Sequence, residues 1–224
     1  KKHPKSTLAA DALYYQGLAM MEGNDPDRAR AAFEKLLREH ADSPRAPEAQ
    51  YKIAATYGLP NPKSESDLNF GARALREFLR LYPRHELAPK AGLEIGLSFL
   101  NAGQFDKAVE ELTSFVKAFR GREAVEVGRA AYLIGEAHKR AGRFDAAITG
   151  WQDYLREFPA HENWQAAQGA IVSTRYAQAQ MLFRKKKWPE AEQAFRDFAA
   201  AYPLDGRNAA ALLMLGQIPL AQAE

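Results

Sequence analysis

The first candidates for metal-binding chemistry are five histidines, in a chain of 224 residues that contains no cysteine. No short metal-type spacing joins any two of them, and the lack of cysteine removes thiolate ligands. The carboxylates are scattered, and neighbours such as Glu110 and Glu111 fit a solvated helix surface better than an acid–base pair across a cleft. We therefore predict no metal site and no cofactor. The histidines are His3, His40, His85, His138 and His161.

Motifs for nucleophilic or phosphate chemistry are also missing from the sequence. No glycine-rich phosphate loop of either common type is present. Nothing marks the strained turn that carries a nucleophilic serine. The glycines at 92, 96 and 103 are spaced for contacts between helices. We predict that the chain is not an enzyme.

Two basic clusters remain as candidate sites, and each is predicted to lie where a helix ends in a turn. Cations at such a place interact favourably with the helix C-terminal carbonyls. The alternative is a basic rim that meets an acidic partner or an anionic polymer. The net charge of +3 is too small to predict nucleic-acid binding. The rim would consist of Lys139, Arg143, Arg184, Lys185, Lys186 and Lys187.

The elements that must position these residues are helices, because apolar residues recur at three- and four-residue spacing along the chain. With 46% hydrophobic and 26% charged residues, the composition is that of an ordinary globular protein. The longest uncharged run, 208–223, contains Gly216 and Pro219 and is shorter than the roughly 20 residues of a membrane span. The periodicity predicts helices over 7–23, 26–40, 44–57, 68–82, 87–101, 105–119, 162–186 and 208–217, with a further pair in 128–159 around a turn at 141–143.

A set of small and large residues repeats at fixed offsets through these helices. Counted from Gly135, the pattern has Ala147 after twelve residues, Trp151 after sixteen and Pro159 after twenty-four. The same offsets from Gly17 and Gly96 give alanine and then phenylalanine or leucine. A small residue lets a neighbouring helix approach, and the large residue fills the space. Further matches are Ala29, Phe33, Ala108, Leu112, Gly71, Leu75, Pro83, Ala191, Phe195 and Pro203.

This pattern resembles the tetratricopeptide repeat, which has Leu-Gly in a first helix and Ala-x3-Phe then Pro in a second. The resemblance implies an all-α fold, a right-handed superhelical α-solenoid of antiparallel helix pairs in a single domain, 1–224. The repeated small positions are 37 to 44 residues apart, above the usual 34, so longer loops or helices must absorb the excess. We expect about five repeats and a closing helix, over 7–42, 44–83, 86–120, 122–159, 161–203 and 206–218.

Sequence segments such as SPRAPEAQYKIA and HELAPKAGLEIG make the resemblance more specific. They are similar to the repeat variant of bacterial cell-envelope proteins, of the cell-division coordinator and outer-membrane assembly lipoprotein type. That likeness implies a place in the periplasm or cell envelope. The segment 151–216 also resembles repeats that precede bacterial alpha-2-macroglobulins. Because the sequence begins at Lys1 without Met or an apolar signal region, we expect a processed chain or a part of a longer protein.

In this family the first helix of each pair lines a concave groove that takes the ligand. The resemblance therefore implies a non-catalytic interaction scaffold that binds a peptide or partner helix. The alternatives are a spacer or docking segment of a larger envelope protein, and a glycan-binding or enzymatic envelope module. The clamp for chaperone C-termini is not reproduced, since Thr56 and Glu94 stand at its positions. The predicted groove residues are Tyr14, Leu18, Lys52, Thr56, Lys90, Leu93, Leu97, Asn101, Arg129, Tyr132, Glu136, Arg140, Tyr176 and Gln180.

Overall fold

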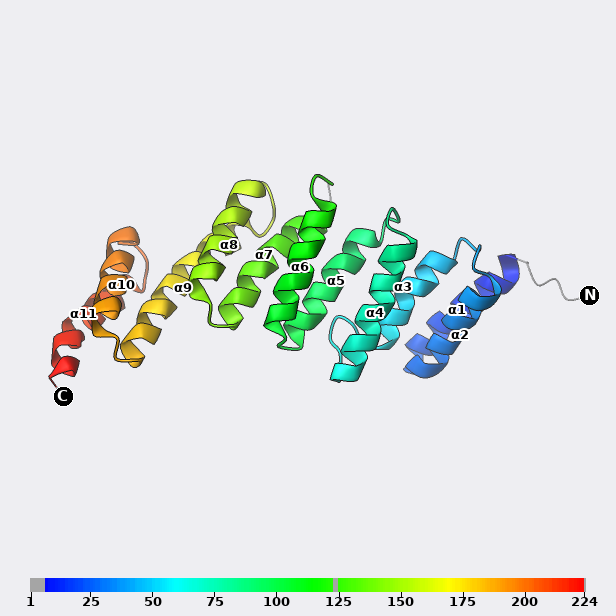
Figure 1. The fold of residues 1–224 in the computed structure, drawn as a ribbon, viewed down its shortest axis with the longest axis horizontal. Coiled ribbons are helices and arrows are strands. Elements are labelled where there is room, and N and C mark those ends of the chain that lie inside the picture. Colours follow the sequence, from blue (N-terminus) through cyan, green and yellow to red (C-terminus); the bar gives the residue numbers. More distant parts are fainter. Residues whose placement is uncertain (1–6, 123–124, 224) are drawn as a thin grey trace, which may run out of the picture. The chain divides into compact units, whose positions relative to one another are not determined.

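A computed structural model describes residues 7–122 and 125–223, and in those residues it has eleven α-helices and no strand (Figure 1). The predicted all-α class is confirmed. The helices are α1 (Thr7–Glu22), α2 (Pro26–Glu39), α3 (Ala46–Thr56), α4 (Glu65–Leu81), α5 (Ala88–Asn101), α6 (Phe105–Phe119), α7 (Val125–Arg140), α8 (Phe144–Glu157), α9 (Trp164–Arg184), α10 (Trp188–Ala201) and α11 (Asn208–Gln222).

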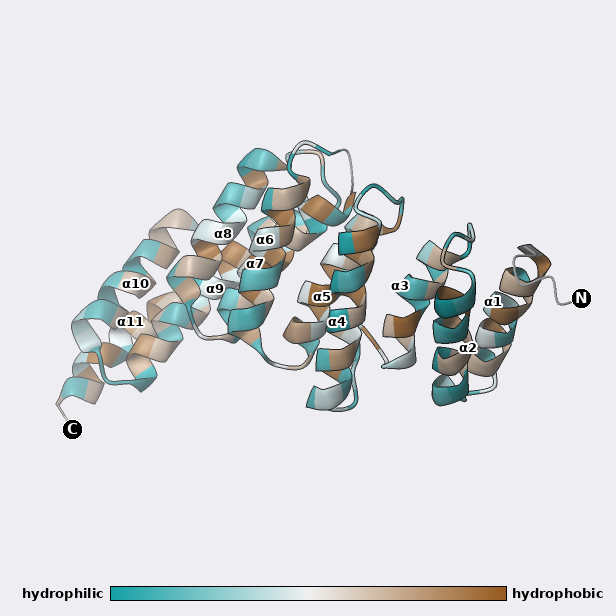
Figure 2. Ribbon diagram, turned by 45° about the vertical axis from the view of Figure 1, so that its right-hand side comes forward, coloured by the Kyte–Doolittle hydropathy of each residue, from teal (hydrophilic) through white to brown (hydrophobic). Residues whose placement is uncertain are grey.

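The chain divides into two compact units, 1–133 and 134–224, with the division inside α7. In the first unit each helix from α1 to α6 packs against the next helix along the chain. In the second unit α8 packs on α9, α9 on α10 and α10 on α11. We call α1, α3, α5, α7, α9 and α11 first helices and the others second helices. The second helix α2 shows a mostly hydrophilic surface in Figure 2.

The predicted contacts between small and large residues are present in the helix pairs. A Cβ added to Gly17 would lie 2.5 Å from the Phe33 ring, and one added to Gly135 would lie 2.5 Å from Cε2 of Trp151. Both aromatic rings are fully buried. Each glycine therefore makes the space that an aromatic ring of the following helix occupies.

The turns inside the pairs also share one conformation. Asn24, Gly103, Gly142 and Lys186 all have φ between 57° and 74°. Each ends a first helix in the left-handed region, which glycine adopts without a Cβ penalty and asparagine tolerates. Lys186 adopts the same φ although it is neither glycine nor asparagine.

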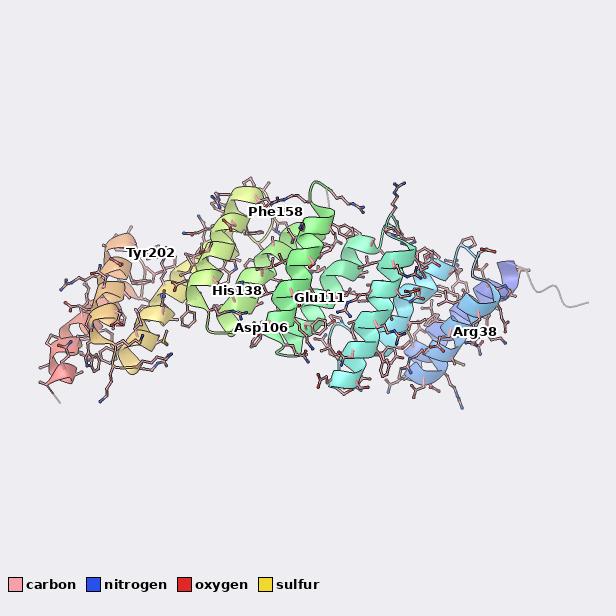
Figure 3. The ribbon with its side chains drawn as sticks, in the orientation of Figure 1. Arg38, Asp106, Glu111, His138, Phe158 and Tyr202 are labelled. Atoms are coloured by element: carbon pink, nitrogen blue, oxygen red, sulfur yellow. The ribbon has the colours of Figure 1, made fainter. Side chains whose placement is uncertain are left out.

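Aromatic residues followed by proline end several second helices. Tyr82, Phe158 and Tyr202 are the C-terminal caps of α4, α8 and α10, and the last two are labelled in Figure 3. The N–H of Tyr82 still donates to the Phe78 carbonyl at 2.8 Å. The next residue is proline, which has no N–H to continue the helix.

Histidine stabilises two of the turns that follow these caps. The Nδ1 of His85 accepts from the N–H of Leu87 at 3.2 Å, and the Nδ1 of His161 accepts from the N–H of Asn163 at 3.3 Å. The hydroxyl of Tyr154 also lies 2.8 Å from Nδ1 of His161. These histidines therefore stabilise the turns that lead into the next first helix. We did not predict this role from the sequence, where the histidines were considered as metal ligands.

The main departures from the predicted helices lie around the loop at 57–64. Helix α4 begins at Glu65, three residues before the predicted start, because the Ser64 hydroxyl accepts from the N–H of Asp67 at 3.0 Å. Leu59 from the loop occupies the space beside Gly71, where a Cβ would meet its Cδ2 at 2.9 Å. The loop therefore packs against a glycine of the second helix α4.

Two other predicted bounds were wrong by several residues. Helix α3 begins at Ala46 and not at 44, because Ser43 and Pro44 form the preceding turn, where the Ser43 hydroxyl accepts from the N–H of Arg45 at 3.2 Å. Helix α11 runs to Gln222 and includes Pro219. At the start of α2, Asp25 is the N-cap, and its side chain accepts from the N–H of Arg28 at 3.2 Å.

Candidate functional site

The most organised polar group on the first helices joins α3 to α5. The Tyr51 hydroxyl donates to Oε1 of Glu94 at 2.6 Å, and Nζ of Lys90 lies 5.8 Å from the centre of the Tyr51 ring. Lys90 is exposed and Lys52 is half-buried. We call these four residues, Tyr51, Lys52, Lys90 and Glu94, the α3–α5 polar cluster. It brings together two of the predicted groove residues, Lys52 and Lys90.

Electrostatics in this cluster favour a partner that carries negative charge. Burial raises the pKa of Glu94, while the Tyr51 hydrogen bond and the charges of Lys90 and Lys52 partly oppose this rise. Burial also raises the pKa of Tyr51, so its hydroxyl stays protonated as the donor. Glu94 is half-buried with its carboxylate held by Tyr51, Lys52 is also half-buried, and Lys90 is exposed, so the charged group of the cluster that is most accessible to solvent is the Lys90 ammonium.

Two further predicted residues lie farther along α5. Leu97 is half-buried, and Leu93, one turn earlier, is buried. The amide of Asn101 donates to the Pro60 carbonyl at 3.0 Å and to Oδ1 of Asn61 at 2.9 Å. Asn101 therefore anchors the loop before α4 to the end of α5, and only Leu97 of the three adds apolar surface next to the cluster.

The predicted residues on α1 offer little surface. Tyr14 is buried, and its ring packs 6.0 Å from that of Phe33, with the Arg45 guanidinium 5.2 Å from its centre. Burial is also the main reason that the pKa of Tyr14 is raised. Leu18 is half-buried. In this structure Tyr14 contributes to the core between α1 and α2.

The predicted residues on α7 fall on either side of the division between units. In the first unit Arg129 is exposed and Tyr132 is half-buried. In the second unit Nε of Arg140 lies 3.9 Å from Oε2 of Glu136, a pair four residues apart on the helix. Such surface pairs contribute little to stability. Their side chains remain accessible, and their role in binding stays a prediction.

On α9 the predicted residues face their own partner helix. The Tyr176 ring lies 6.0 Å from that of Phe195 and 5.2 Å from that of Phe198 on α10. Gln180 is half-buried. Tyr176 therefore packs within the fifth helix pair, as an inter-helix contact and not as a freely presented ring.

The basic rim occupies two turns at the same edge of the second unit (Figure 1). In the first turn Nζ of Lys139 lies 5.9 Å from the Trp151 ring centre, and Nε of Arg143 donates to Nδ1 of His138 at 3.1 Å. His138 is half-buried, as its repeat position predicts. In the second turn Lys187 lies 3.9 Å from a Glu190 carboxylate oxygen. The remaining members, Arg184, Lys185 and Lys186, are exposed.

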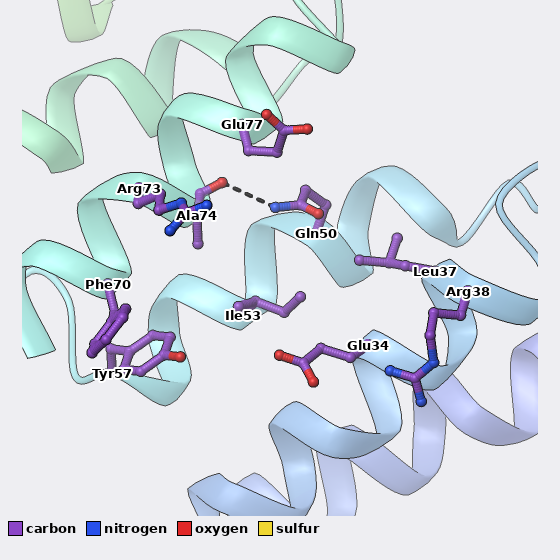
Figure 4. A pocket seen from close by; sticks show the side chains of 10 residues that line it. All are labelled: Glu34, Leu37, Arg38, Gln50, Ile53, Tyr57, Phe70, Arg73, Ala74 and Glu77. Atoms are coloured by element: carbon purple, nitrogen blue, oxygen red, sulfur yellow. Dashed lines mark hydrogen bonds between the residues drawn. The ribbon is translucent and has the colours of Figure 1, made fainter.

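A groove that the repeat pattern did not predict lies between α2 and α4 and has α3 as its floor (Figure 4). Its volume is about 460 Å³. Phe70 is 50% exposed and stacks on Tyr57 with ring centres 5.6 Å apart. Arg38 of α2 and Arg73 of α4 are exposed on opposite rims. The groove combines an apolar floor with charged rims and lies on the second-helix side of the first unit.

Metal-type clusters and membrane-spanning helices were both sought in residues 7–122 and 125–223. Within these ranges no three His, Asp or Glu side chains gather where they could hold a metal ion. None of the helices described there has the length and apolar character needed to cross a bilayer.

Comparisons with known proteins identify the repeats. Two family models described as "Tetratricopeptide repeat" match residues 93–170 and 11–43. These two parts of the chain therefore match the tetratricopeptide repeat. No curated protein matches the sequence.

Solved structures of other repeat proteins share the fold. A tetratricopeptide repeat protein from Parabacteroides merdae is 13% identical with a TM-score of 0.55, covering 96% of this chain and 77% of that one. A MamA protein is 20% identical with a TM-score of 0.53, covering 90% and 94%. Kinesin light chain-like repeats from Podosopora anserina are 14% identical with a TM-score of 0.53, covering 90% and 97%. At these identities the likeness concerns the fold, and it confirms the predicted solenoid of tetratricopeptide helix pairs.

The repeat register thus located the helices better than it located the accessible surface. It placed Lys52, Lys90 and Leu97 on first helices, where Lys90 is exposed and the other two are half-buried, but it could not show that Tyr14 is buried. It also missed the α2–α4 groove. One signal was available, because Phe70 departs from the helical face shared by Leu68 and Leu75.

Proposed function

We propose that this tetratricopeptide-repeat chain is an interaction scaffold that binds an extended or helical segment of a partner protein through the α3–α5 polar cluster and Leu97. The tetratricopeptide fold supports a scaffold that binds proteins. The observation that carries the choice of surface is the hydrogen bond that engages the Glu94 carboxylate with Tyr51, beside the exposed Lys90 and the half-buried Lys52. A partner segment with acidic residues around an apolar side chain fits these groups.

The cellular setting belongs to the same proposal. We place the scaffold in a complex of the bacterial cell envelope, on the periplasmic side. The support is the resemblance of the phrases around 43–54 and 85–96 to repeats of bacterial envelope proteins. Cell fractionation of the producing organism, with the native protein detected by antibody, tests this part separately. Recovery only with cytoplasmic markers would refute the envelope setting and leave the binding surface untouched.

Site-specific crosslinking tests the binding surface. A photoreactive amino acid replaces Lys90 in one protein and Lys117 in another, and both are expressed in the producing organism. Lys117 is the matched control because it is an exposed lysine of the same unit on a second helix, α6. We expect a discrete crosslinked partner from position 90 and none of that mass from position 117.

A charge-reversal pair then tests the chemistry of that contact. The double variant Lys52→Glu/Lys90→Glu should lose the partner crosslinked through a probe at Leu97, whereas Lys117→Glu should retain it. If the double variant retains the partner in full, the lysines of the cluster do not recognise it. Equal crosslinking from positions 90 and 117 would show that the first helices are not the binding surface.

A further inference from the structure

The α2–α4 groove has an unused hydrogen-bond acceptor at its floor. Gln50 of α3 is only 8% exposed, and its amide nitrogen donates to the Ala74 carbonyl of α4 at 3.1 Å. A carbonyl oxygen can only accept, so the amide nitrogen must face Ala74, and Figure 4 shows Oε1 of Gln50 on the groove side. No described residue donates to this oxygen. A largely buried amide oxygen of this kind favours a ligand that brings a hydrogen-bond donor.

One end of the groove is a preorganised aromatic platform. The Arg30 guanidinium lies over the Tyr57 ring, with Cζ 3.9 Å from the ring centre, and Nε of Arg30 donates to the Thr56 hydroxyl at 3.0 Å. Tyr57 in turn stacks on Phe70, which stays half exposed. These contacts hold the two rings in place without burying Phe70. An aromatic side chain of a ligand can therefore pack on Phe70 at little cost in conformational entropy.

The charges at the rims favour an anionic ligand. Arg38 of α2 and Arg73 of α4 are exposed, and neither forms an ion pair or hydrogen bond with a described side chain. The Glu77 carboxylate is already bound by the Arg80 guanidinium, through hydrogen bonds of 2.7 and 2.9 Å. Glu34, the other acidic residue of the lining, balances only one of the two rim arginines. Arginines on opposite rims are placed for two separate carboxylates, because each guanidinium can hold one in a bidentate pair.

These three features together select an extended protein segment. An extended backbone has N–H groups free to donate, whereas a helix uses its own N–H groups internally beyond the first turn. Side chains of successive residues can then bring an aromatic ring to the platform and carboxylates to both rims. A small anion with a single carboxylate would leave one rim arginine and the Gln50 acceptor without partners.

We propose that the α2–α4 groove binds an extended acidic segment of a partner protein. An aromatic side chain of this segment stacks on Phe70, and one of its backbone N–H groups donates to Oε1 of Gln50. Its carboxylates, before and after the aromatic residue, pair with Arg38 and Arg73. The residues of the α3–α5 polar cluster are not among those that line the groove, so binding here does not depend on that cluster.

Selection from a phage-displayed library of random linear peptides, with the purified full chain as bait, tests this binding. We expect enriched sequences in which Phe, Tyr or Trp has Asp or Glu on both sides. Fluorescence anisotropy then measures the affinity of synthetic copies of these peptides. The double variant Arg38→Glu/Arg73→Glu should bind them about tenfold more weakly or worse, because it replaces both pairing cations. Far-UV circular dichroism confirms that each variant is folded.

Two double variants with the same change in charge are the controls. Lys35→Glu/Lys117→Glu changes exposed lysines of α2 and α6 outside the groove, and Lys52→Glu/Lys90→Glu changes the α3–α5 polar cluster. Both should bind the enriched peptides with the affinity of the unaltered protein. If the peptides lose affinity only for Lys52→Glu/Lys90→Glu, the groove is not their site, and the binding surface proposed for the cluster is supported instead.

The Gln50 hydrogen bond is tested by a double-mutant cycle. Gln50→Met removes the acceptor at similar volume, and N-methylation removes the backbone N–H groups of the peptide one at a time. One methylated position should weaken binding to the unaltered protein about fivefold or more and should have little effect on binding to Gln50→Met. Equal effects of methylation in the two proteins would overturn the contact with Gln50. A library that yields no acidic aromatic sequence would overturn the whole proposal, as would peptides that bind Arg38→Glu/Arg73→Glu with unchanged affinity.

Discussion

Replacing Gly135 with alanine is the sharpest test of how the helix pairs are held together. The new methyl group would lie 2.5 Å from Cε2 and 2.6 Å from Cδ1 of Trp151, a fully buried ring of the following helix. Carbon atoms in favourable contact are about 3.5 Å apart, so the indole must move by about 1 Å. A buried ring in a close-packed core cannot make that movement without displacing its neighbours.

The magnitude follows from two opposing terms. Overpacking of this kind costs about 1–3 kcal/mol. Alanine in place of glycine within a helix increases the free energy of unfolding by about 1 kcal/mol. A control with the same backbone term exists at Gly169 of α9, where an added Cβ meets nothing within 4 Å. The difference in unfolding free energy between Gly135→Ala and Gly169→Ala therefore isolates the overpacking, about 1–3 kcal/mol.

Thermal unfolding followed by far-UV circular dichroism measures both variants against the unaltered protein. Gly169→Ala should raise the midpoint slightly. Gly135→Ala should unfold several degrees below Gly169→Ala, since about 2–4 °C corresponds to 1 kcal/mol in a chain of this size. In a Trp151→Phe background, where the ring is smaller, the two alanine variants should differ less. Equal midpoints for the two single variants in the unaltered background would refute the proposed close contact.

Two other substitutions test the cluster and the loop. Burial raises the pKa of Glu94, so its protonated form stabilises the fold at low pH and that contribution is lost as the pH rises through the folded-state pKa. Glu94→Gln keeps an acceptor for Tyr51, and it should raise the unfolding midpoint at neutral pH but not below the ordinary carboxyl pKa of about 4.3. A midpoint difference that is the same at both pH values would contradict this reasoning. Ser64→Ala removes the cap of α4 and should cost about 1 kcal/mol in urea unfolding. Ser66→Ala, an exposed neighbour in the first turn, is its control, and an equal loss from both would argue against the cap.

The fold could be predicted from the sequence because the contacts between helices use few residue types at fixed offsets. Gly135 with Trp151 and Gly17 with Phe33 show the same spacing in sequence and the same contact in space. The site was less predictable, because the repeat register gives the helix face on which a residue lies but not how deeply its side chain is buried. Tyr14 and Lys52 both belong to first helices, yet one is buried against Phe33 and the other reaches the surface.

The hydrogen bonds in the turns between helix pairs were also not predictable from the sequence. Ser43, His85, His161 and Asp205 each use a side-chain atom to accept from the N–H two residues later. Three different residue types can supply that acceptor, so a pattern of residue identities does not reveal it. From the sequence we considered the histidines as metal ligands, but in the structure two of them accept hydrogen bonds within local turns.

Departures from the repeat are informative about surface features for a physical reason. In regular pairs a large second-helix residue fills the space at a first-helix glycine, and both are buried. Around residues 57–71 the arrangement differs, because the glycine, Gly71, lies on the second helix α4 and Leu59 of the preceding loop fills the space beside it. The flanking aromatic residues Tyr57 and Phe70 are then not required in the core, and they stack on each other at the edge of the α2–α4 groove. The irregular loop therefore accounts for the groove, and in this chain the stretch that fits the repeat least is the one that shapes an accessible apolar surface.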